Sequence, residues 1–306
     1  MSGQTTVAAP AIATEKLTKR FGGLTAVSEL NLEVQPGEVI GFLGPNGAGK
    51  TTTIRMLLGF IQPTSGRAAV LGGVPAKDTA LRRRIGYLPG DFRIDQSMTG
   101  NDLFTWFGEL RGGVRRERAD ELIARLQLDP NLRFGSLSKG NRQKIGLVQA
   151  FMHDPDVLIL DEPTTGLDPL VQREFLDLVR ETADRGASIL FSSHVLPEVE
   201  KVASRIAIIR AGRLITISLV SELLNRARQR LELRFAAPPS ANLFDGVPGV
   251  VESQVHGTSV IILVDGPVGP VMESALKGPT LLRVGSAGDD LEDLFMSFYE
   301  HRVAED

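Results

Sequence analysis

Apolar runs of four to six residues alternate with segments of helical period between residues 12 and 217. The runs that are apolar enough to be buried strands lie at residues 38–43, 157–160 and 188–192. Segments with apolar residues at helical spacing follow them, at residues 52–58, 169–184 and 196–203. Strands that alternate with helices in this way are typical of an α/β domain with a largely parallel sheet.

Two parts of this region depart from the alternation. Residues 12–34 read as short strands around a turn at 21–23, and another short strand is predicted at 67–71. Helical period dominates from residue 101 to about 126, where one helix face collects Leu103, Trp106, Phe107 and Leu110. We expect Trp106 and its aromatic neighbours to be core residues, with a groove for a partner protein as the alternative.

The pattern changes again beyond residue 222, where a charged helix is predicted up to residue 230. Strands follow at residues 231–235, 250–255, 259–264 and 281–284, and helices at residues 268–276 and 291–299. A hairpin with helices indicates a small α+β domain, which could be ferredoxin-like. The chain therefore divides into a disordered N-terminal tail (residues 1–11), a main domain (12–225) and a small α+β C-terminal accessory domain (226–306).

Composition and charge are those of an ordinary folded protein. Of the 306 residues, 42% are apolar and 23% are charged. The net charge of −3 gives no electrostatic reason to expect nucleic-acid binding. There is no cysteine, which excludes disulfides, thiol chemistry and cysteine metal sites, and His153, His256 and His301 lack metal-ligand spacing.

Nothing in the sequence predicts that this chain enters a membrane by itself. The first eleven residues lack the basic and apolar regions of a signal peptide. No apolar run approaches the roughly 20 residues that a membrane-spanning helix needs. If the protein works at a membrane, we expect another chain to supply the spans.

A glycine-rich loop joins the strand predicted at residues 38–43 to the next helix. It is a complete G-x-x-x-x-G-K-[ST] motif, made of Gly44, Pro45, Asn46, Gly47, Ala48, Gly49, Lys50 and Thr51. Glycines let the backbone close tightly, so that N–H groups and the helix N-terminus can hold phosphate oxygens. Lys50 can reach the β- and γ-phosphates, and the Thr51 hydroxyl can ligate Mg²⁺. Because the flanking strand and helix disfavour a chance match, the loop predicts a nucleoside-triphosphate site.

Two adjacent carboxylates, Asp161 and Glu162, follow the strand predicted at residues 157–160. Ligands of open α/β sheets bind beyond the carboxyl ends of the strands. An Asp at such a position can hold Mg²⁺, and a following Glu can polarise an attacking water. We therefore predict that Asp161 serves the metal and that Glu162 is catalytic, rather than both being surface acids.

Three further segments accompany the loop and the carboxylates: residues 137–143 (Leu-Ser-Lys-Gly-Asn-Arg-Gln), 166–168 (Gly-Leu-Asp) and 192–194 (Ser-Ser-His). In motif order and spacing, this set resembles the ATP-binding cassette family. The resemblance covers about residues 12–224. It implies an α/β P-loop NTPase cassette with a parallel-sheet core, a helical subdomain and an antiparallel β subdomain.

The resemblance also implies roles for the residues around one ATP molecule. The glycine-rich loop would bind the nucleotide, and Thr52 would lie close to its phosphates. Asp161 would serve Mg²⁺, Glu162 would activate water, and His194 would contact the γ-phosphate. Phe21 would stack on the adenine, with ordinary core packing as the alternative.

Members of this family pair two cassettes head to tail, and the resemblance therefore implies a homodimer in the ATP state. Ser138 and Gly140 match the signature that reaches the γ-phosphate of the ATP on the partner chain. Asp168 would lie in the loop that crosses the dimer interface. The signature departs from the LSGGQ pattern at Lys139 and Asn141, and Lys139 adds positive charge near a triphosphate.

A second departure lies after the strand predicted at residues 85–89. The family usually has glutamine there, which senses Mg²⁺ and water and links the site to the membrane subunit. This chain has Gly90, which has no side chain for either task. Asp91 could take over the metal contact. We expect ATP binding to be retained, with coupling or turnover altered.

The sequence beyond Arg230, ending in Asp-Leu-Glu-Asp-Leu-Phe at 290–295, resembles the C-terminal extension of antibiotic- and multidrug-type exporters. We therefore expect the ATP-hydrolysing subunit of an exporter, bound to a separate permease through residues 90–110 at the cytoplasmic face of the membrane. Drug, antibiotic or lipid-like substrates are expected. The alternatives are a soluble cassette ATPase acting on ribosomes or DNA, and a P-loop kinase for a small acceptor; import instead of export also stays open.

Overall fold

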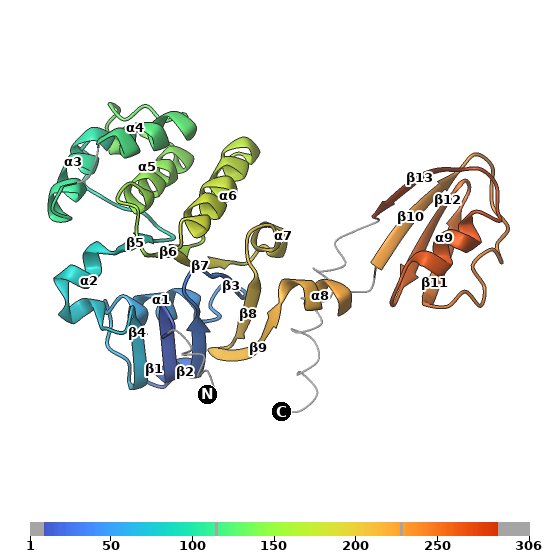
Figure 1. The fold of residues 1–306 in the computed structure, drawn as a ribbon, viewed down its shortest axis with the longest axis horizontal. Coiled ribbons are helices and arrows are strands. Elements are labelled where there is room, and N and C mark those ends of the chain that lie inside the picture. The colour runs from blue at the N-terminus through green and yellow to red at the C-terminus, as the bar shows by residue number, and fades with distance from the viewer. Residues whose placement is uncertain (1–8, 114–115, 227–228, 287–306) are drawn as a thin grey trace, which may run out of the picture. The chain divides into compact units, whose positions relative to one another are not determined.

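The computed structural model describes residues 9–113, 116–226 and 229–286 (Figure 1). These residues form two compact units, divided between Ile217 and Ser218. Residues 1–8 of the expected disordered tail lie outside the described part. Ala11, which the expected tail includes, is buried, and its N–H donates to the Val34 carbonyl over 2.8 Å. The folded part of the first unit therefore includes Ala11.

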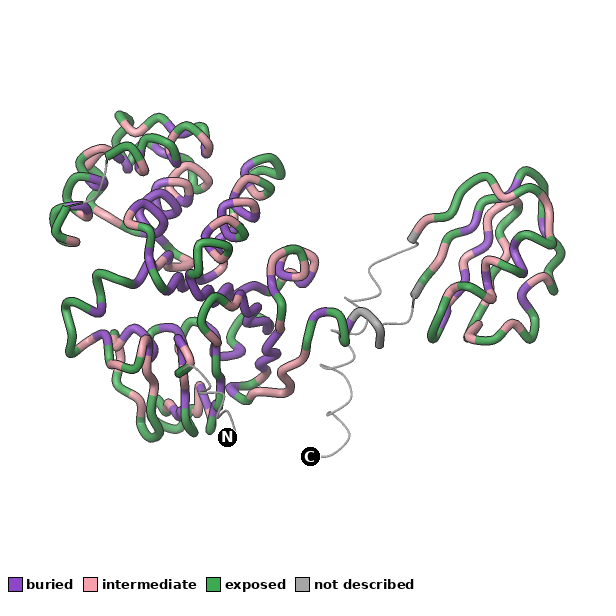
Figure 2. The backbone as a smooth tube through the Cα atoms, viewed as in Figure 1, coloured by how far each residue is buried: buried purple, intermediate pink, exposed green. Residues whose placement is uncertain are grey.

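A six-stranded sheet of order β5-β6-β7-β3-β8-β9 forms the centre of the first unit. Its strands are β3 (Val39–Leu43), β5 (Ile85–Leu88), β6 (Val157–Asp161), β7 (Ser188–Ser193), β8 (Arg205–Arg210) and β9 (Arg213–Leu219). The four pairs from β5 to β8 are parallel. Every residue of β3, β6 and β7 is buried, as strands covered on both faces require (Figure 2). The predicted parallel-sheet core is confirmed.

The strand register brings three loops to one edge of this sheet. Leu43 at the end of β3 pairs with Ser193 of β7, and Asp161 at the end of β6 pairs with Ser192. The loops that leave these strands lead to helices α1 (Lys50–Leu57), α6 (Pro169–Asp184) and α7 (Leu196–Glu200). The glycine-rich loop, the two carboxylates and His194 therefore start from neighbouring strand ends.

A second sheet in this unit is antiparallel, with the order β2-β1-β4. Its strands are β1 (Ile12–Phe21), β2 (Leu24–Val34) and β4 (Ser65–Val70). β1 and β2 are longer than the short strands expected, because their pairing continues through several register shifts. Leu17 and Leu30 of this sheet share a core with Ile54 and Leu57 of α1, which fixes the helix after the glycine-rich loop.

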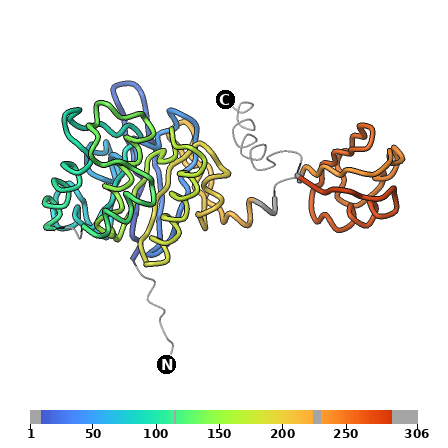
Figure 3. The backbone as a smooth tube through the Cα atoms, turned by 90° about the horizontal axis from the view of Figure 1, so that it is seen from above, coloured from blue at the N-terminus to red at the C-terminus, as the bar shows by residue number. Residues whose placement is uncertain are grey.

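Helices α3 (Gly100–Leu110), α4 (Arg116–Arg125) and α5 (Lys139–Phe151) form the predicted helical part. Figure 1 shows them together at the top of the first unit, and Figure 3 shows this unit from above, with these helices in teal and green. α3 begins with a capping box, in which the Thr99 side chain accepts from the Asp102 N–H and the Asp102 carboxylate accepts from the Thr99 N–H. A short helix, α2 (Thr79–Arg83), precedes β5.

The expectation that Trp106 lies in the core is wrong. α3 packs through Leu103, Phe104 and Gly108, which are buried, whereas Trp106 is 49% exposed and Leu110 is 52% exposed. At 3.6 residues per turn, Trp106 lies about 200° around the helix from Phe104 and points away from the packed face. Its indole rests against the Phe107 ring, with 4.9 Å between the centroids.

The second unit has a four-stranded antiparallel sheet of order β11-β12-β10-β13. Its elements are α8 (Val220–Arg226), β10 (Gln229–Phe235), β11 (Val250–His256), β12 (Ser259–Val264), α9 (Gly269–Ala275) and β13 (Leu281–Ser286). Phe235, Phe244 and Ile262 are among its fully buried core residues. This is the strand order of a ferredoxin-like fold, with turns at residues 241–246 where the first crossover helix would lie. The helix predicted at 291–299 lies outside the described residues.

No helix in the described part of the chain is long and apolar enough to cross a membrane.

Candidate functional site

The glycine-rich loop connects β3 to α1, and a larger residue would not fit at Gly44 or Gly49. Gly49 has a φ of 109° at the N-cap of α1, a left-handed conformation that favours glycine. A Cβ atom at Gly49 would lie 2.7 Å from the Ala26 carbonyl oxygen, and one at Gly44 would lie 2.4 Å from the Ile209 carbonyl oxygen. The loop therefore closes tightly against the neighbouring strands and turns into the helix N-terminus.

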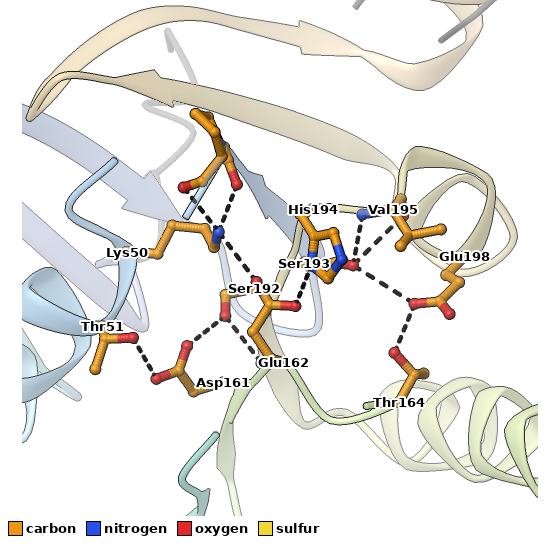
Figure 4. Close-up of polar contacts among 12 residues, drawn as sticks. Lys50, Thr51, Asp161, Glu162, Thr164, Ser192, Ser193, His194, Val195 and Glu198 are labelled. Carbon is orange, nitrogen blue, oxygen red and sulfur yellow. Dashed lines mark hydrogen bonds and ion pairs between the residues drawn. The ribbon is translucent and has the colours of Figure 1, made fainter. Parts of the chain in front are cut away.

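The side chain of Lys50 lies inside this loop (Figure 4). It is only 5% exposed, and its ammonium donates to the carbonyl oxygens of Gly44 and, over 3.3 Å, Pro45. The same ammonium lies 3.0 Å from Oε1 of Glu162. The positive charge of Lys50 is therefore held within the loop that is predicted to bind phosphates.

Beside Lys50, two hydroxyl groups hold the Asp161 carboxylate. Thr51 Oγ1 donates to Asp161 Oδ2 over 2.8 Å, and Ser192 Oγ donates to Oδ1 over 2.7 Å. Asp161 itself is 1% exposed. A single carboxylate next to a threonine hydroxyl fits Mg²⁺, which binds one or two carboxylates together with water and substrate phosphates. The described residues offer no cluster of three or more His, Cys, Asp or Glu that would hold a metal alone.

Glu162 lies between Lys50 and His194 (Figure 4). Its Oε2 is 2.7 Å from His194 Nδ1, and its backbone N–H lies 3.1 Å from both the carbonyl oxygen and Oγ of Ser192. Glu162 has a φ of 49°, a conformation that costs non-glycine residues about 1–3 kcal/mol. The Ser192 contacts hold this strained backbone and direct the carboxylate toward Lys50 and His194.

Ser138, Gly140 and Asp168 lie at the beginnings of two helices. Ser138 is the N-cap of α5 and accepts a hydrogen bond from the Asn141 N–H over 3.2 Å. A Cβ atom at Gly140 would lie 2.6 Å from the Gly166 carbonyl oxygen, so the signature segment packs directly on the loop before α6. Asp168 caps α6, and hydrogen bonds from the Val171 and Leu170 N–H groups lower the pKa of its carboxyl.

Phe21 and Thr52 are the remaining residues predicted for the nucleotide. Phe21 ends β1, its ring is 50% exposed, and the Lys19 ammonium lies 5.0 Å from its centroid. Thr52 follows Thr51 in α1 and is half-buried. An exposed aromatic ring is available for stacking, whereas a core phenylalanine would not be. The interpretation of Phe21 as ordinary core packing is therefore excluded by its exposure.

Sequence reasoning missed four polar residues that support the site. They are Ser192, Gln143, Thr164 and Glu198. Gln143 donates a hydrogen bond to the Pro163 carbonyl over 3.0 Å, and the Thr164 hydroxyl donates one to the Glu198 carboxylate over 2.7 Å. Gln143 is 4% exposed on α5. The sequence could have indicated Gln143, because it occupies a position on the apolar face of its helix. A buried polar side chain there needs a hydrogen-bond partner.

Gly90 lies directly beside the Asp161 carboxylate. A Cβ atom at this position would be 3.3 Å from the Asp161 carbonyl oxygen and 3.7 Å from Oδ2. Asp91, the suggested substitute, is exposed and pairs with Arg93 over 2.6 Å, which lowers the pKa of the Asp91 carboxyl. The geometry therefore favours position 90, rather than Asp91, as the place from which a side chain could reach the Asp161 carboxylate.

Replacing Gly90 by glutamine is expected to lower the Mg²⁺ concentration needed for half-maximal ATP hydrolysis by about tenfold, because the added amide can orient a metal ligand. The measurement is a Mg²⁺ titration of ATPase rate. Gly90→Ala is the matched control, since it adds the same Cβ crowding without the amide. Equal Mg²⁺ dependence in Gly90→Gln, Gly90→Ala and the parent chain would show that position 90 does not limit metal use.

Comparison with protein families and with curated proteins places these features in a known group. The family model described as ABC transporter matches residues 27–165, which contain the glycine-rich loop and both carboxylates. The chain is 34% identical over 286 residues to the Nod factor export ATP-binding protein I of Burkholderia lata, covering 91% of this chain and 93% of that protein. It is also 34% identical over 296 residues to the bacitracin transport ATP-binding protein BcrA of Bacillus licheniformis, covering 93% and 96%.

Solved structures share the fold. An ATP binding subunit of an ABC transporter superimposes with a TM-score of 0.65 at 26% identity, over 70% of this chain and 91% of that chain. The ATP-binding cassette MJ0796, solved as a dimer bound to ADP and Pi, gives a TM-score of 0.61 at 22% identity, over 68% and 98%. The predicted fold class is therefore confirmed.

Proposed function

The chain belongs to the ABC transporter ATPase family, and we propose that it drives a separate membrane permease by hydrolysing ATP between two copies of itself. The observation that carries the proposal is the position of the Glu162 carboxylate, 3.0 Å from Lys50 and 2.7 Å from His194. A potential general base, a phosphate-binding lysine and a histidine meet at the edge where the glycine-rich loop opens. This arrangement suits transfer of a phosphoryl group to water.

We propose that Thr51 and Asp161 hold Mg²⁺ beside the bound ATP. Their oxygens are the donor types that Mg²⁺ prefers, and the 2.8 Å between Thr51 Oγ1 and Asp161 Oδ2 supports a shared metal site. When bound, Mg²⁺ neutralises negative charge on the phosphate oxygens. The Ser192 hydroxyl, which donates to the other Asp161 oxygen, keeps the carboxylate in that orientation.

In the proposed reaction, Glu162 accepts a proton from the attacking water. In this structure, Glu162 Oε1 faces the Lys50 ammonium. When that ammonium moves to the phosphates, Oε1 becomes available to the attacking water. Its Oε2 keeps the contact with His194 Nδ1, which fixes the direction of the carboxylate. The other ring nitrogen of His194 remains for the γ-phosphate.

Dimerisation is proposed because Ser138 and Gly140 contact Asn141 and the loop before α6, and not Lys50, Thr51 or Asp161. Ser138 is exposed at the N-terminus of α5, which can hold an anion. Gly140 packs on the loop that carries Asp168, so a nucleotide bound at the signature would also influence that loop. In a head-to-tail homodimer these residues would act on the partner chain's ATP.

We propose that the permease docks in an apolar groove of about 480 Å³ in the first unit. Its wall includes Phe60 and Leu110, which are 61% and 52% exposed, together with Tyr87 and Phe92. Large exposed apolar side chains around a groove mark a site for a protein partner. Asp91 also lines the groove, so an occupant would contact the segment beside Gly90 and Asp161.

Replacing Leu110 by glutamine is expected to weaken permease binding about tenfold and to leave the ATPase rate of the isolated chain unchanged, because an apolar contact is lost outside the nucleotide site. The measurement compares ATPase rates with and without the permease. Leu276→Gln is the control, since Leu276 is 75% exposed and does not line the groove. Full permease stimulation of Leu110→Gln would contradict docking at this groove.

The proposed direction of transport is export. The relatives named above are a Nod factor export protein and a bacitracin transport protein. Drug, antibiotic or lipid-like molecules are therefore the proposed substrates, and the proposed location is the cytoplasmic face of the membrane, through the permease. The C-terminal residues 226–306 are proposed to brace or regulate the dimer.

Two observations separate this proposal from the alternatives. A transport ATPase releases free phosphate, whereas a kinase would transfer the phosphoryl group to an acceptor, so product analysis distinguishes them. Co-purification with membranes rather than ribosomes or DNA distinguishes the transporter subunit from a soluble cassette ATPase.

A further inference from the structure

A polar pocket of about 320 Å³ lies in the first unit, outside the nucleotide site. Four separate helices or their ends form it: α2, α3, α4 and the turn after α5. The side chains used below are Arg83, Arg111, Arg118, His153 and Asp154. None of them takes part in the contacts of Lys50, Asp161 or Glu162.

Positive charge exceeds negative charge in this pocket. Asp154 is the one carboxylate in its described lining, and it lies 3.2 Å from Nε of Arg118. Arg118 is 10% exposed and also pairs with Glu121 over 2.8 Å. In the described part of the chain, no carboxylate pairs with Arg83 or Arg111. Within the described residues, two guanidinium groups of the pocket therefore have no carboxylate as a counter-charge.

Arg111 is largely buried although no described carboxylate pairs with it. Its guanidinium contacts the Phe107 carbonyl over 3.4 Å and the Phe107 ring at 5.2 Å. In the orientation of the Gln149 amide that lets its nitrogen donate to the Tyr87 carbonyl, the amide oxygen accepts a hydrogen bond from the Arg111 guanidinium over 2.8 Å. Burial lowers the pKa of Arg111 to about 10. A guanidinium removed from water without a carboxylate is unfavourable, so an anion is the missing partner.

His153 adds a hydrogen-bond acceptor to the same wall. Its Nε2 lies 3.2 Å from the Ile85 carbonyl oxygen and must donate there, which leaves Nδ1 as an acceptor. Burial, followed by the charge of Arg111, lowers the pKa of His153 to about 3, so the ring is neutral at pH 7. Among the described residues, His153 Nδ1, Arg111 Nε and Arg118 Nη2 are buried without a hydrogen-bond partner.

We propose that this pocket binds a protonated phosphate group, either as free phosphate or as a phosphomonoester. Guanidinium groups donate to its oxygens, and the P–OH group donates to His153 Nδ1. Sulfate has the same shape but carries no such proton at pH 7, so the pocket distinguishes the two ions. Arg83 and Arg111 also line the apolar groove, and an occupant would neutralise charge at the rim of that groove.

The test uses the full chain with its nucleotide site saturated by Mg-ADP. Inorganic phosphate is titrated by calorimetry, with sulfate at equal ionic strength as the comparison. Phosphate is expected to bind tighter than sulfate, and Arg83→Gln and Arg118→Gln are each expected to raise the Kd about tenfold through one lost charged hydrogen bond. Arg83→Gln keeps the test valid if the buried Arg118 is needed for folding, since Arg83 is exposed. Arg133→Gln, an equal charge change outside the pocket, should bind as the parent chain does.

A second arm identifies the source of the phosphate. The same variants are mixed with phosphatidylcholine vesicles with or without phosphatidic acid. If the chain binds phosphatidic acid, and if Arg83→Gln weakens this binding while Arg133→Gln does not, the pocket is assigned to a lipid headgroup. If the chain binds only free phosphate, the pocket is assigned to the soluble ion. The proposal is overturned if neither probe binds, if sulfate binds equally, or if Arg133→Gln weakens binding as much as the pocket variants do.

Discussion

Replacing Glu162 by glutamine is expected to slow ATP hydrolysis about 10²- to 10⁴-fold while ATP still binds, since that is the usual contribution of a general base. Glutamine keeps the size of the side chain but cannot accept a proton from water. The contacts proposed between the phosphates and Lys50 or the glycine-rich loop would not need that carboxylate. The measurements are the rate of phosphate release at saturating Mg-ATP and the Kd of ATP.

Glu117→Gln is the control for this change. Glu117 is an exposed residue of α4, so its replacement alters the net charge equally and should leave the rate unchanged. A Glu162→Gln variant that hydrolyses ATP at the parent rate would show that another group takes the proton. The His194 contact would then have to be reinterpreted.

Replacing Lys50 by alanine is expected to weaken ATP binding about 100-fold, because charged hydrogen bonds to phosphate contribute about 1.5–3 kcal/mol. The lysine is 5% exposed within its loop, where its ammonium donates to the Gly44 and Pro45 carbonyl oxygens. Removal also leaves the Glu162 Oε1 without its ion pair. The Kd of ATP, measured by calorimetry, gives the size of the loss.

Lys77→Ala is the control for the lysine variant, since Lys77 is exposed and lies outside the loop. The melting temperature of each variant shows whether the fold is kept. ATP affinity in Lys50→Ala equal to that in Lys77→Ala would contradict the assignment of the glycine-rich loop as the phosphate site.

Most of the predictions of fold and site rest on short contiguous motifs in the sequence. The glycine-rich loop needs glycine at set positions, and the residues before Asp161 are apolar because β6 is buried on both faces. Such local requirements are visible without coordinates. The parallel register then brings Asp161 beside Ser192, which follows from alternating strands and helices but cannot be derived from either segment alone.

Contacts between distant segments could not be predicted. The hydrogen bond from Ser192 to Asp161 joins residues 31 positions apart, and the positive φ of Glu162 depends on contacts with that same serine. Leu103 of the predicted apolar face is buried but Trp106 is exposed, because helical spacing shows which residues share a face and not how far the packing extends across it. Phe104, rather than Trp106, lies on the buried side of α3.

The central claim is that two copies of the chain bind ATP between them. The most direct test is the solution mass of the Glu162→Gln variant with and without Mg-ATP. A monomer that becomes a dimer only with Mg-ATP, and that stays a monomer when Lys50→Ala is added, is the result that the account predicts. A mass that does not change while ATP binds with the expected affinity would contradict the shared site and leave the chain as a cassette that hydrolyses ATP alone.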